Sequence, residues 1–426
     1  MMLPLLAVDT EAPAPTSDFF FHDGDIPAVF LGDSITEQRM YTTLVETYVL
    51  TRFPTWKISF RNAGWGGDTV WLTRRGDFNT GLQRDVLSLQ PKSVTIDFGM
   101  NDARGGDGAY PKYIEYSTKL VEALKKAGAR VALITASPEE KYEADAPAGS
   151  SYNLMLKKYS DGLKEIADKE NVPFVDQLTP VIHFIEAGRK SGLLSKTVPL
   201  AGGKEKCLTN DGVHPNWGGH LIMATAILKG LRAPALVSSA SLDAGTRSII
   251  AAKGCAIEWQ DAPNDVVQFK RTDEALPWPI DPECDLALKI PGFDPATALN
   301  RYELKVKGLK AASYKLTMDD HEIGTYSSAD LANGVNLGFV RQGPIYDQGQ
   351  KLLKAVVDKN NAYFNRWRNV QVYQVPEWLK ANLDDIKAAR TAEMARLDKV
   401  IADQEQTIEL LRKPVPHVFK LEPVGK

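Results

Sequence analysis

One serine in this chain has the surroundings of a catalytic nucleophile. Ser34 follows the apolar run Ala28–Leu31 in the sequence Gly32-Asp33-Ser34, and helix-forming residues follow from Glu37. A strand that ends in a tight turn before a helix places that turn at the carboxyl edge of a sheet, where backbone N–H groups at the helix start point outward. The hydroxyl of such a serine faces a crevice. The alternative is that Asp33 or Ser34 only caps the helix.

The chain also contains a histidine with an acid at a suitable spacing. The stretch Asn210-Asp211-Gly212-Val213-His214-Pro215 is predicted to form a turn that leads into a helix. A carboxylate three residues before an imidazole can accept from one ring nitrogen and leave the other free as a base. Of the six histidines, only His214 has an acid at this spacing in a predicted loop, whereas His220 is interpreted as an ordinary helix residue.

Two further stretches that follow predicted strands offer hydrogen-bond donors. The stretch Arg61–Thr69 contains three glycines, Gly67 among them, which let the backbone approach a ligand and point an N–H into a cavity. A phosphate-binding loop is a rival use of such glycines, but the Lys-Ser/Thr of a P-loop is absent. Asn101, in Gly99-Met100-Asn101-Asp102, offers a side-chain amide, and an Asx-turn or a helix cap is its alternative.

Alternating strands and helices from about Ile26 to Val237 are expected to position these residues. Short apolar runs joined by amphipathic helices indicate a parallel sheet that is covered on both faces. We therefore predict an α/β catalytic domain over residues 18–237. The expected strands are Ala28–Leu31, Lys57–Asn62, Ser93–Phe98, Arg130–Ala136 and Pro173–Asp176. The expected helices are Glu37–Thr51, Asn79–Leu89, Tyr113–Lys126, Asn153–Glu170, Thr179–Gly192 and a last one that starts at Pro215.

The sequence after this domain predicts strands without intervening helices. Ser238–Ala244 is small and polar, which indicates a linker or turn, and a small antiparallel β domain is predicted over residues 251–330. Its expected strands are Cys255–Trp259, Val266–Lys270, Leu286–Ile290, Tyr302–Lys307 and Tyr314–Met318.

A helical region is predicted over residues 340–413, with helices at Pro344–Asn369 and Trp378–Arg412. The second helix carries apolar residues at spacings of three, four and seven from Leu383 to Leu411. An exposed stripe of that length would promote association. We therefore expect these helices to pack on the α/β domain or across the interface of a homo-oligomer.

The four stretches that could do chemistry resemble the blocks of the SGNH/GDSL esterase–lipase superfamily, in chain order. The blocks are Gly32-Asp33-Ser34, Gly66-Gly67-Asp68-Thr69, Gly99-Met100-Asn101-Asp102 and Asp211-Gly212-Val213-His214-Pro215. The resemblance covers about residues 26–235, and the whole chain is similar to bacterial carbohydrate esterases with an appended C-terminal region. It implies a flavodoxin-like α/β/α three-layer fold and a carboxylic ester hydrolase without a cofactor.

The resemblance also implies a role for each matching residue. Ser34 would be the nucleophile, His214 the base and Asp211 the acid that orients it. The Ser34 N–H, the Gly67 N–H and the Asn101 side chain would form the oxyanion hole. This agrees with the chemistry, because a serine hydroxyl needs a hydrogen-bonded base at neutral pH. Donors placed for the oxyanion contribute about 2.7–4 kcal/mol each.

Substrate-binding candidates are Trp65, Asp33 and Arg104. Trp65 lies inside the second block, and Arg104 begins a glycine-rich stretch to Tyr110 that we expect to form a flexible rim. An aromatic ring beside polar loops suits a sugar that carries a small acyl group, although simple packing against the sheet is the alternative for Trp65. No large apolar lining is evident in these loops.

We therefore expect the removal of acetyl or other short acyl groups from a small-molecule or polysaccharide ester. A lipase or thioesterase that acts on longer acyl esters is one alternative. A carbohydrate-binding or scaffolding protein with a vestigial esterase site is another, and the intact Ser34, Asp211 and His214 argue against it.

Composition and charge limit the partners of the protein. The 426 residues are 43 % hydrophobic and 25 % charged with a net charge of −3, which is typical of a globular protein with two or three domains. No basic run indicates nucleic acid, and no apolar stretch approaches the ~20 residues of a membrane-spanning helix. The three cysteines, Cys207, Cys255 and Cys284, lack metal-ligand spacing, so no metal site is expected.

The first residues of the sequence bear on its location. Met1–Ala7 lacks a basic start and is too short for a full signal peptide. Interpreted as the remnant of a removed signal, it favours a secreted or periplasmic protein of a bacterium. A cytoplasmic location stays open.

Overall fold

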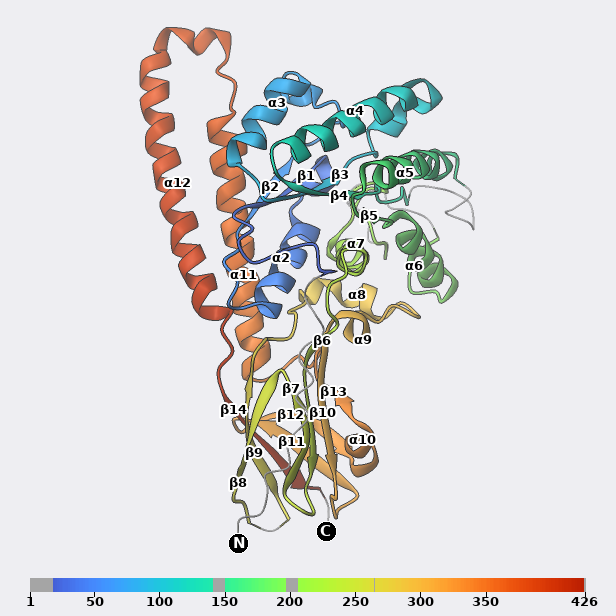
Figure 1. Cartoon of the computed structure of the whole chain (residues 1–426), viewed down its shortest axis with the longest axis vertical. Coiled ribbons are helices and arrows are strands. Elements are labelled where there is room, and N and C mark those ends of the chain that lie inside the picture. The colour runs from blue at the N-terminus through green and yellow to red at the C-terminus, as the bar shows by residue number, and fades with distance from the viewer. Residues whose placement is uncertain (1–17, 141–149, 197–205, 264, 425–426) are drawn as a thin grey trace.

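The first part of the chain is built on a parallel β-sheet, as the sequence predicts (Figure 1). The computed structural model describes residues 18–140, 150–196, 206–263 and 265–424, and the first residues, 1–17, lie outside this range. The strand order is β2-β1-β3-β4-β5. Strands β1 and β3 are buried at every position; β1 is an apolar run that ends in glycine, whereas β3 also contains the buried polar residues Ser93, Thr95 and Asp97. The strands are β1 (Ala28–Gly32), β2 (Phe60–Gly64), β3 (Ser93–Asp97), β4 (Arg130–Ile134) and β5 (Phe174–Val175).

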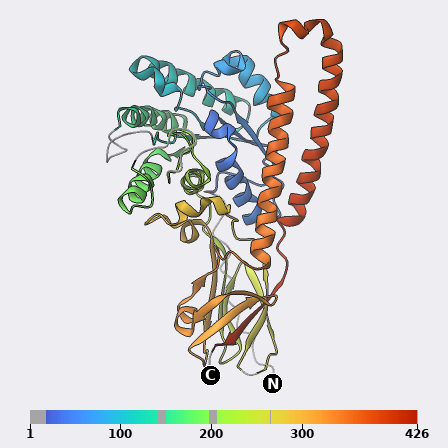
Figure 2. The ribbon, with the colours of Figure 1, turned by 180° about the vertical axis from the view of Figure 1, so that it is seen from behind.

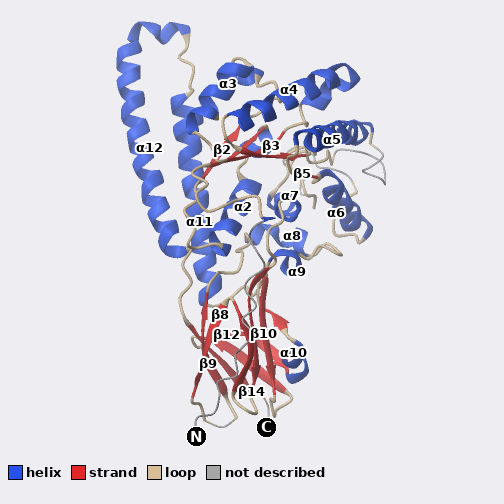
Figure 3. Ribbon diagram, in the orientation of Figure 1, coloured by secondary structure: helices blue, strands red, loops and turns tan. Residues whose placement is uncertain are grey.

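Helices cover both faces of this sheet and make the three layers of an α/β/α domain (Figure 3). One face carries α3 (Phe78–Asp85), α4 (Gly106–Lys126) and α5 (Ser151–Glu170). The other face carries α2 (Met40–Arg52), α6 (Leu178–Lys190) and α7 (Trp217–Gly230). The order of the strands brings the ends of β2, β1 and β3 side by side at one edge of the sheet.

The second part of the chain is a sandwich of two sheets (Figure 1). One sheet has the order β13-β10-β6-β7, with β6 (Leu236–Asp243), β7 (Ser248–Lys253), β10 (Arg301–Lys307) and β13 (Val335–Asn336). The other has the order β12-β11-β14-β9-β8, with β8 (Cys255–Gln260), β9 (Val267–Asp273), β11 (Ser313–Met318), β12 (His321–Ser327) and β14 (His417–Pro423). Residues from both sheets, such as Leu304 and Phe269, are fully buried in one shared core.

The stretch Ser238–Ala244 is not a linker, and that prediction is wrong. It forms most of β6, where Ser238 is fully buried. The Ser238 hydroxyl donates to Asp273 Oδ1 at 2.6 Å and accepts from Arg271 Nη2 at 2.7 Å. Because this buried network satisfies the polar side chains, a sequence of small polar residues serves as an interior strand.

The stretch Leu286–Ile290, predicted as a strand, instead contains the short helix α8 (Asp285–Leu288). The chain turns into it through a 3₁₀ turn at Pro282–Cys284, where the side chain of Asp281 accepts from the N–H of Glu283. An acidic cap followed by proline is a helix-start signal, and it outweighs the β propensity of the apolar residues here. A second short helix, α9 (Pro295–Leu299), follows.

The helical region is an insertion within the β sandwich. After β13 the chain forms α11 (Pro344–Phe364), a π-helical turn at Asn365–Gln371 and α12 (Leu383–Leu411), and β14 then returns to the second sheet between β11 and β9. The β region thus extends beyond the predicted range 251–330 at both ends, with β6 before it and β14 near the end of the chain. Helix α10 (Ser328–Asn333) lies within it. No helix in the described residues is long and apolar enough to cross a membrane.

The helices α11 and α12 lie beside the α/β domain in both views of the molecule (Figures 1 and 2). Helix α11 contacts α2 and the edge strand β2, while α12 runs alongside α11. The stripe of α12 is covered at Leu397, Ile401 and Ile408, each 6 % exposed. The expectation that these helices pack on the α/β domain therefore agrees with the structure, and assembly into a homo-oligomer stays a prediction.

A buried ion pair fixes α11 to α2. The Lys359 ammonium donates to Glu46 Oε1, and the Asn360 side chain donates to Glu46 Oε2 at 3.0 Å. The side chains of Lys359 and Glu46 are 2 % and 4 % exposed. Burial lowers the pKa of Lys359, against the opposing effect of the Glu46 carboxylate. Substitution of either partner alone would leave a buried charge without compensation.

We expect Lys359→Met to lower the free energy of unfolding by about 3–5 kcal/mol, because Glu46 is left buried and unpaired. Urea denaturation measures this change. Lys354→Met is the matched control, since Lys354 lies on the same helix with a side chain that is 75 % exposed, and a change below about 1 kcal/mol is expected there. A similarly small loss for Lys359→Met would contradict the locking role of the pair.

Candidate active site

The nucleophile candidate lies at the end of β1, as predicted. Asp33 accepts from the Ile35 N–H at 2.9 Å and caps the short helix α1 (Ser34–Glu37), whose first residue is Ser34. A Cβ on Gly32 would lie 2.1 Å from Thr36 Oγ1 and 2.6 Å from the carbonyl oxygen of Asp97. Only glycine therefore allows this close approach of the turn to β3. Asp33 therefore caps the helix, as the alternative interpretation proposes, and the Ser34 hydroxyl is still available for catalysis.

The structure brings Ser34, His214 and Asp211 together in one line of hydrogen bonds. His214 Nε2 lies 2.9 Å from Ser34 Oγ, and His214 Nδ1 lies 2.8 Å from Asp211 Oδ2. Because a carboxylate can only accept, Nδ1 carries the ring proton of neutral His214, and Nε2 is left to accept from the Ser34 hydroxyl.

Backbone groups hold the carboxylate in place. Asp211 Oδ1 accepts from the N–H of His214 at 2.8 Å and from the N–H of Val213 at 3.0 Å. Burial raises the pKa of Asp211, but these bonds and the His214 ring outweigh it, so the pKa lies below its ordinary value. The carboxylate therefore stays ionised near neutral pH, as orientation of the imidazole requires.

A buried glutamate that the sequence analysis missed supports the histidine loop. Glu140 Oε2 accepts from the N–H and the hydroxyl of Thr209 at 2.8 and 2.7 Å, and the N–H of Glu140 donates to the Gly212 carbonyl at 2.7 Å. Glu140 is fully buried, and this burial raises its pKa against the opposing hydrogen bonds. Its partners lie about seventy residues away, so no local pattern marks it.

The interpretation of His220 as an ordinary helix residue agrees with the structure. Its ring is fully buried in α7, where Nδ1 accepts from the Tyr41 N–H at 3.3 Å and Nε2 lies 3.1 Å from Gln38 Oε1. Burial lowers the pKa of His220 to about 3, with a smaller contribution from His214. The Gln38 amide also donates to the Pro215 carbonyl at 3.2 Å, so Gln38 links the nucleophile segment to the histidine loop.

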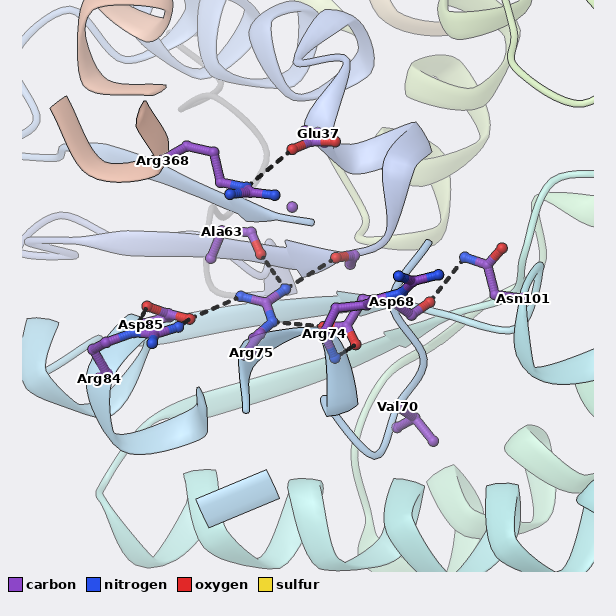
Figure 4. Close-up of polar contacts among 12 residues, drawn as sticks. Glu37, Ala63, Asp68, Val70, Arg74, Arg75, Arg84, Asp85, Asn101 and Arg368 are labelled. Carbon is purple, nitrogen blue, oxygen red and sulfur yellow. Dashed lines mark hydrogen bonds and ion pairs between the residues drawn. The ribbon is translucent and has the colours of Figure 1, made fainter. Parts of the chain in front are cut away.

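The two predicted donor loops follow the strands on either side of β1. Gly67 has φ +70°, a left-handed conformation that favours glycine, in the turn after β2. Asn101 lies after β3, and its side-chain amide donates to the Asp68 carbonyl at 2.8 Å (Figure 4). The Asp102 carboxylate accepts from the Val70 N–H at 2.9 Å. The two loops are thus joined at the same edge of the sheet as Ser34.

A buried arginine, also missed by the sequence analysis, fixes the glycine loop. Arg75 donates through Nε to Asp68 Oδ2 at 2.7 Å and through Nη2 to the carbonyls of Ala63 and Gly32 at 2.8 and 3.3 Å (Figure 4). It lies 3.5 Å from Asp85 Oδ2. One side chain therefore holds the carboxyl ends of β1 and β2 against the loop that carries Gly67.

Buried carboxylates lie beneath this edge of the sheet. Burial raises the pKa of Asp97 to about 7, against hydrogen bonds from Gln177 and Tyr41, and it raises that of Asp102 to about 7. The pKa of Asp33 is raised well above its ordinary value by burial and by Asp97. A raised pKa lowers the ionised fraction of each group at a given pH, and this reduces the negative charge next to Ser34, where an anionic intermediate would form.

The predicted substrate-binding residues do not form an open rim. Trp65 is 9 % exposed and packs under the helical insertion against Trp367, with the Arg368 guanidinium 3.6 Å from its ring centroid. Packing therefore accounts for most of the Trp65 surface. Asp33 is buried as the cap of α1 and lies away from solvent.

Arg104 lies on the surface near Asn101, but the stretch Arg104–Tyr110 is not a flexible rim. It forms a 3₁₀ turn at Asp102–Gly105 and the start of α4, because a glycine with φ +58° at position 106 lets the chain pass from one helix into the next. Arg104 pairs with Glu139 at 3.1 Å and stacks over Tyr152, 4.0 Å from its ring centroid. Residues 141–149, which come between β4 and α5, lie outside the described residues.

The parallel sheet, its two helix layers and the serine at the end of β1 define an α/β/α hydrolase domain of the SGNH type. Residues 30–222 match the GDSL-like Lipase/Acylhydrolase family. The chain contains a domain of this family and is a carboxylic ester hydrolase.

Solved structures resemble the chain over different lengths. The structure of BT4096, a gut microbial diltiazem-metabolizing enzyme, is 26 % identical, with 95 % of this chain and 98 % of that chain covered and a TM-score of 0.73. Axe2, an acetylxylan esterase from Geobacillus stearothermophilus, is 23 % identical, with 50 % and 96 % covered and a TM-score of 0.39. BT4096 therefore shares the sandwich and the helical insertion as well as the catalytic domain. No curated protein sequence matches this chain.

Proposed function

We propose that this protein hydrolyses short-chain acyl esters of polar alcohols, carbohydrates above all, through Ser34, His214 and Asp211. The observation that carries the proposal is the pair of hydrogen bonds, 2.9 Å and 2.8 Å long, that joins the three side chains. A hydroxyl that donates to a neutral imidazole, itself held by a carboxylate, is the arrangement that activates serine for attack on a carbonyl.

The proposed reaction has two halves. Ser34 Oγ attacks the ester carbonyl while His214 Nε2 accepts its proton, and the imidazolium then donates this proton to the leaving alcohol. In the second half, His214 activates a water molecule that attacks the acyl-enzyme, and the acid product leaves Ser34. Asp211 keeps the ring oriented and stabilises the imidazolium in both halves.

Oxyanion stabilisation is assigned to the Ser34 N–H, the Gly67 N–H and the Asn101 amide. Ser34 starts α1, and the other two donors come from the loops after the strands that flank β1. Asn101 donates to the Asp68 carbonyl and Arg75 donates to the Asp68 carboxylate. These hydrogen bonds fix the two loops before substrate binds. Donors that are positioned in advance stabilise the developing charge without reorganisation.

The side of the site next to Gly67 supports a polar alcohol. A cavity of about 820 Å³ reaches the Gly67 turn through Arg74, and it is lined by Trp65, arginines and residues of the insertion. An apolar cavity lies elsewhere, between the sandwich and the start of α11, with Ile280, Ile323 and Ile345 in its lining. A long acyl chain requires apolar lining beside the nucleophile, and neither of these two cavities is lined by Ser34, which supports a small acyl group.

We expect kcat/KM to be at least about tenfold higher for 4-nitrophenyl acetate than for 4-nitrophenyl octanoate. The oxyanion donors stabilise the transition states of both esters equally, but the acetate has no long chain of poorly solvated methylene groups. Initial rates over a range of concentrations measure both constants. A preference for octanoate would show that the protein is a hydrolase of longer acyl esters.

A further inference from the structure

The cavity beside Gly67 is lined by four arginines, and carboxylates are absent from the described residues of its lining. Arg74, Arg75 and Arg84 come from the α/β domain, and Arg368 comes from the turn after α11. The remaining lining is Trp65, Gly76, Asn369, Val372, Tyr373 and Gln374. The insertion therefore completes a wall that the catalytic domain begins.

Three of these arginines already pair with carboxylates behind the wall. Arg75 and Arg84 share Asp85, and Arg75 also binds Asp68. Arg368 lies 3.4 Å from Glu37, at the end of the helix that starts with Ser34 (Figure 4). These pairs neutralise the charge of their arginines and fix the shape of the cavity.

Arg74 differs from the other three. Its backbone N–H donates to Asp68 Oδ1 at 3.2 Å, whereas its exposed side chain forms no ion pair with the described residues. A Cβ built on Gly67 would lie 3.5 Å from both Nε and Nη2 of Arg74. An uncompensated guanidinium thus stands directly beside the proposed oxyanion donor Gly67.

We propose that Arg74 binds a carboxylate on the alcohol part of the substrate, so that esters of acidic sugars are favoured over those of neutral sugars. The inference rests on the proposed function and names its substrate class. A guanidinium pairs with a carboxylate through two parallel hydrogen bonds, which gives direction as well as charge. A cavity of about 820 Å³ holds a sugar ring, whereas a short acyl group would leave most of it empty.

Surplus charge and polar neighbours support the same occupant. The four arginines are balanced by three carboxylates, Asp68, Asp85 and Glu37, which leaves one positive charge. Asn369 and Gln374 supply amides that suit sugar hydroxyls, and Tyr373 of the same lining is half-exposed. An acidic sugar satisfies the cation and the amides together.

A matched pair of esters tests the proposal on the full-length enzyme. The mono-acetylated methyl glycosides of glucuronic acid and of glucose differ only by a carboxylate in place of a hydroxymethyl group. We expect kcat/KM to be at least about tenfold higher for the glucuronide, mainly through a lower KM, because a hydrogen-bonded charge pair is worth that much. Raising the salt concentration should reduce this preference.

The variant Arg74→Gln should remove the preference, because it should lower kcat/KM for the glucuronide at least about tenfold more than for the glucoside. Arg396→Gln is the control, because Arg396 lies on α12 with a side chain that is 61 % exposed, and both esters should react as with the wild type. Equal rates for the two esters with the wild type, or an equal loss on both with Arg74→Gln, would overturn the proposal.

A binding measurement separates this inference from the proposed catalysis. Ser34→Ala, titrated with unacetylated methyl glucuronide, should show a change in tryptophan fluorescence from Trp65 that is lost when Arg74→Gln is added. Arg74-dependent binding without hydrolysis of any ester would retain the subsite and refute the proposed function. Hydrolysis without sugar-charge preference, together with no glucuronide binding, would refute the subsite alone.

Discussion

Ser34→Ala is expected to lower kcat/KM for 4-nitrophenyl acetate by about 10⁴-fold or more and to leave the fold intact. The substitution removes the oxygen that forms the acyl-enzyme, and residual activity would come from the oxyanion donors and substrate binding alone. The fold should survive because Ser34 is only partly buried and its hydroxyl contacts His214 rather than the core. Initial rates, with circular dichroism and thermal melting as checks, measure both statements.

Ser248→Ala is the matched control for this experiment. Ser248 is exposed on β7, in the sandwich, and carries the same hydroxyl. We expect wild-type activity from this variant. If Ser34→Ala retained more than about a tenth of the wild-type rate while folded, Ser34 would not be the nucleophile.

His214→Gln is expected to lower kcat/KM nearly as much as Ser34→Ala, by about 10⁴-fold, because the serine loses the acceptor of its proton. The double variant Ser34→Ala/His214→Gln should be no slower than the slower single variant, since the two residues act as one unit. Pre-steady-state rates with a large excess of enzyme resolve activities this low.

His183→Gln serves as the control for the histidine, because His183 is exposed on α6, and its activity should equal that of the wild type. Independent, multiplicative losses in the double variant would contradict the relay. A loss of less than about tenfold for His214→Gln would assign the base to another group.

The triad candidates could be predicted because each lies in a short local pattern at the end of a predicted element. Ser34 follows a strand of apolar residues that ends in glycine, and Asp211 and His214 are three residues apart in one turn. Each of these patterns lies within a few consecutive residues. The oxyanion candidates Gly67 and Asn101 share this property. Parallel strand order then brings the four loops to one edge of the sheet.

The residues that support the site could not be predicted, because their partners are distant in the sequence. Arg75 joins strand ends to the glycine loop, and Glu140 reaches Thr209 across the domain. The sequence predicts Trp65 beside an open rim, but Arg368, which covers its ring, lies some three hundred residues later. A local sequence pattern predicts the turn in which a side chain lies and its spacing from its neighbours. It does not predict which distant residues will pack on that side chain.

The second half of the chain shows the same limit in the fold. The strand β14 completes the second sheet after the long helical insertion, and its seven residues offer little signal by themselves. The buried Ser238 in β6 is satisfied by Asp273 and Arg271, which belong to the other sheet. Long-range hydrogen bonding thus reverses what the local composition of Ser238–Ala244 indicates.

Covalent labelling with a fluorophosphonate, followed by peptide mass mapping, tests the central claim most directly. Such a reagent reacts with a serine whose hydroxyl is activated by a neighbouring base. We predict one label per chain, located on Ser34, and a much slower reaction in His214→Gln. Labelling of a different residue, or labelling of Ser34 at an unchanged rate in His214→Gln, would contradict the assignment of Ser34 and His214 as nucleophile and base.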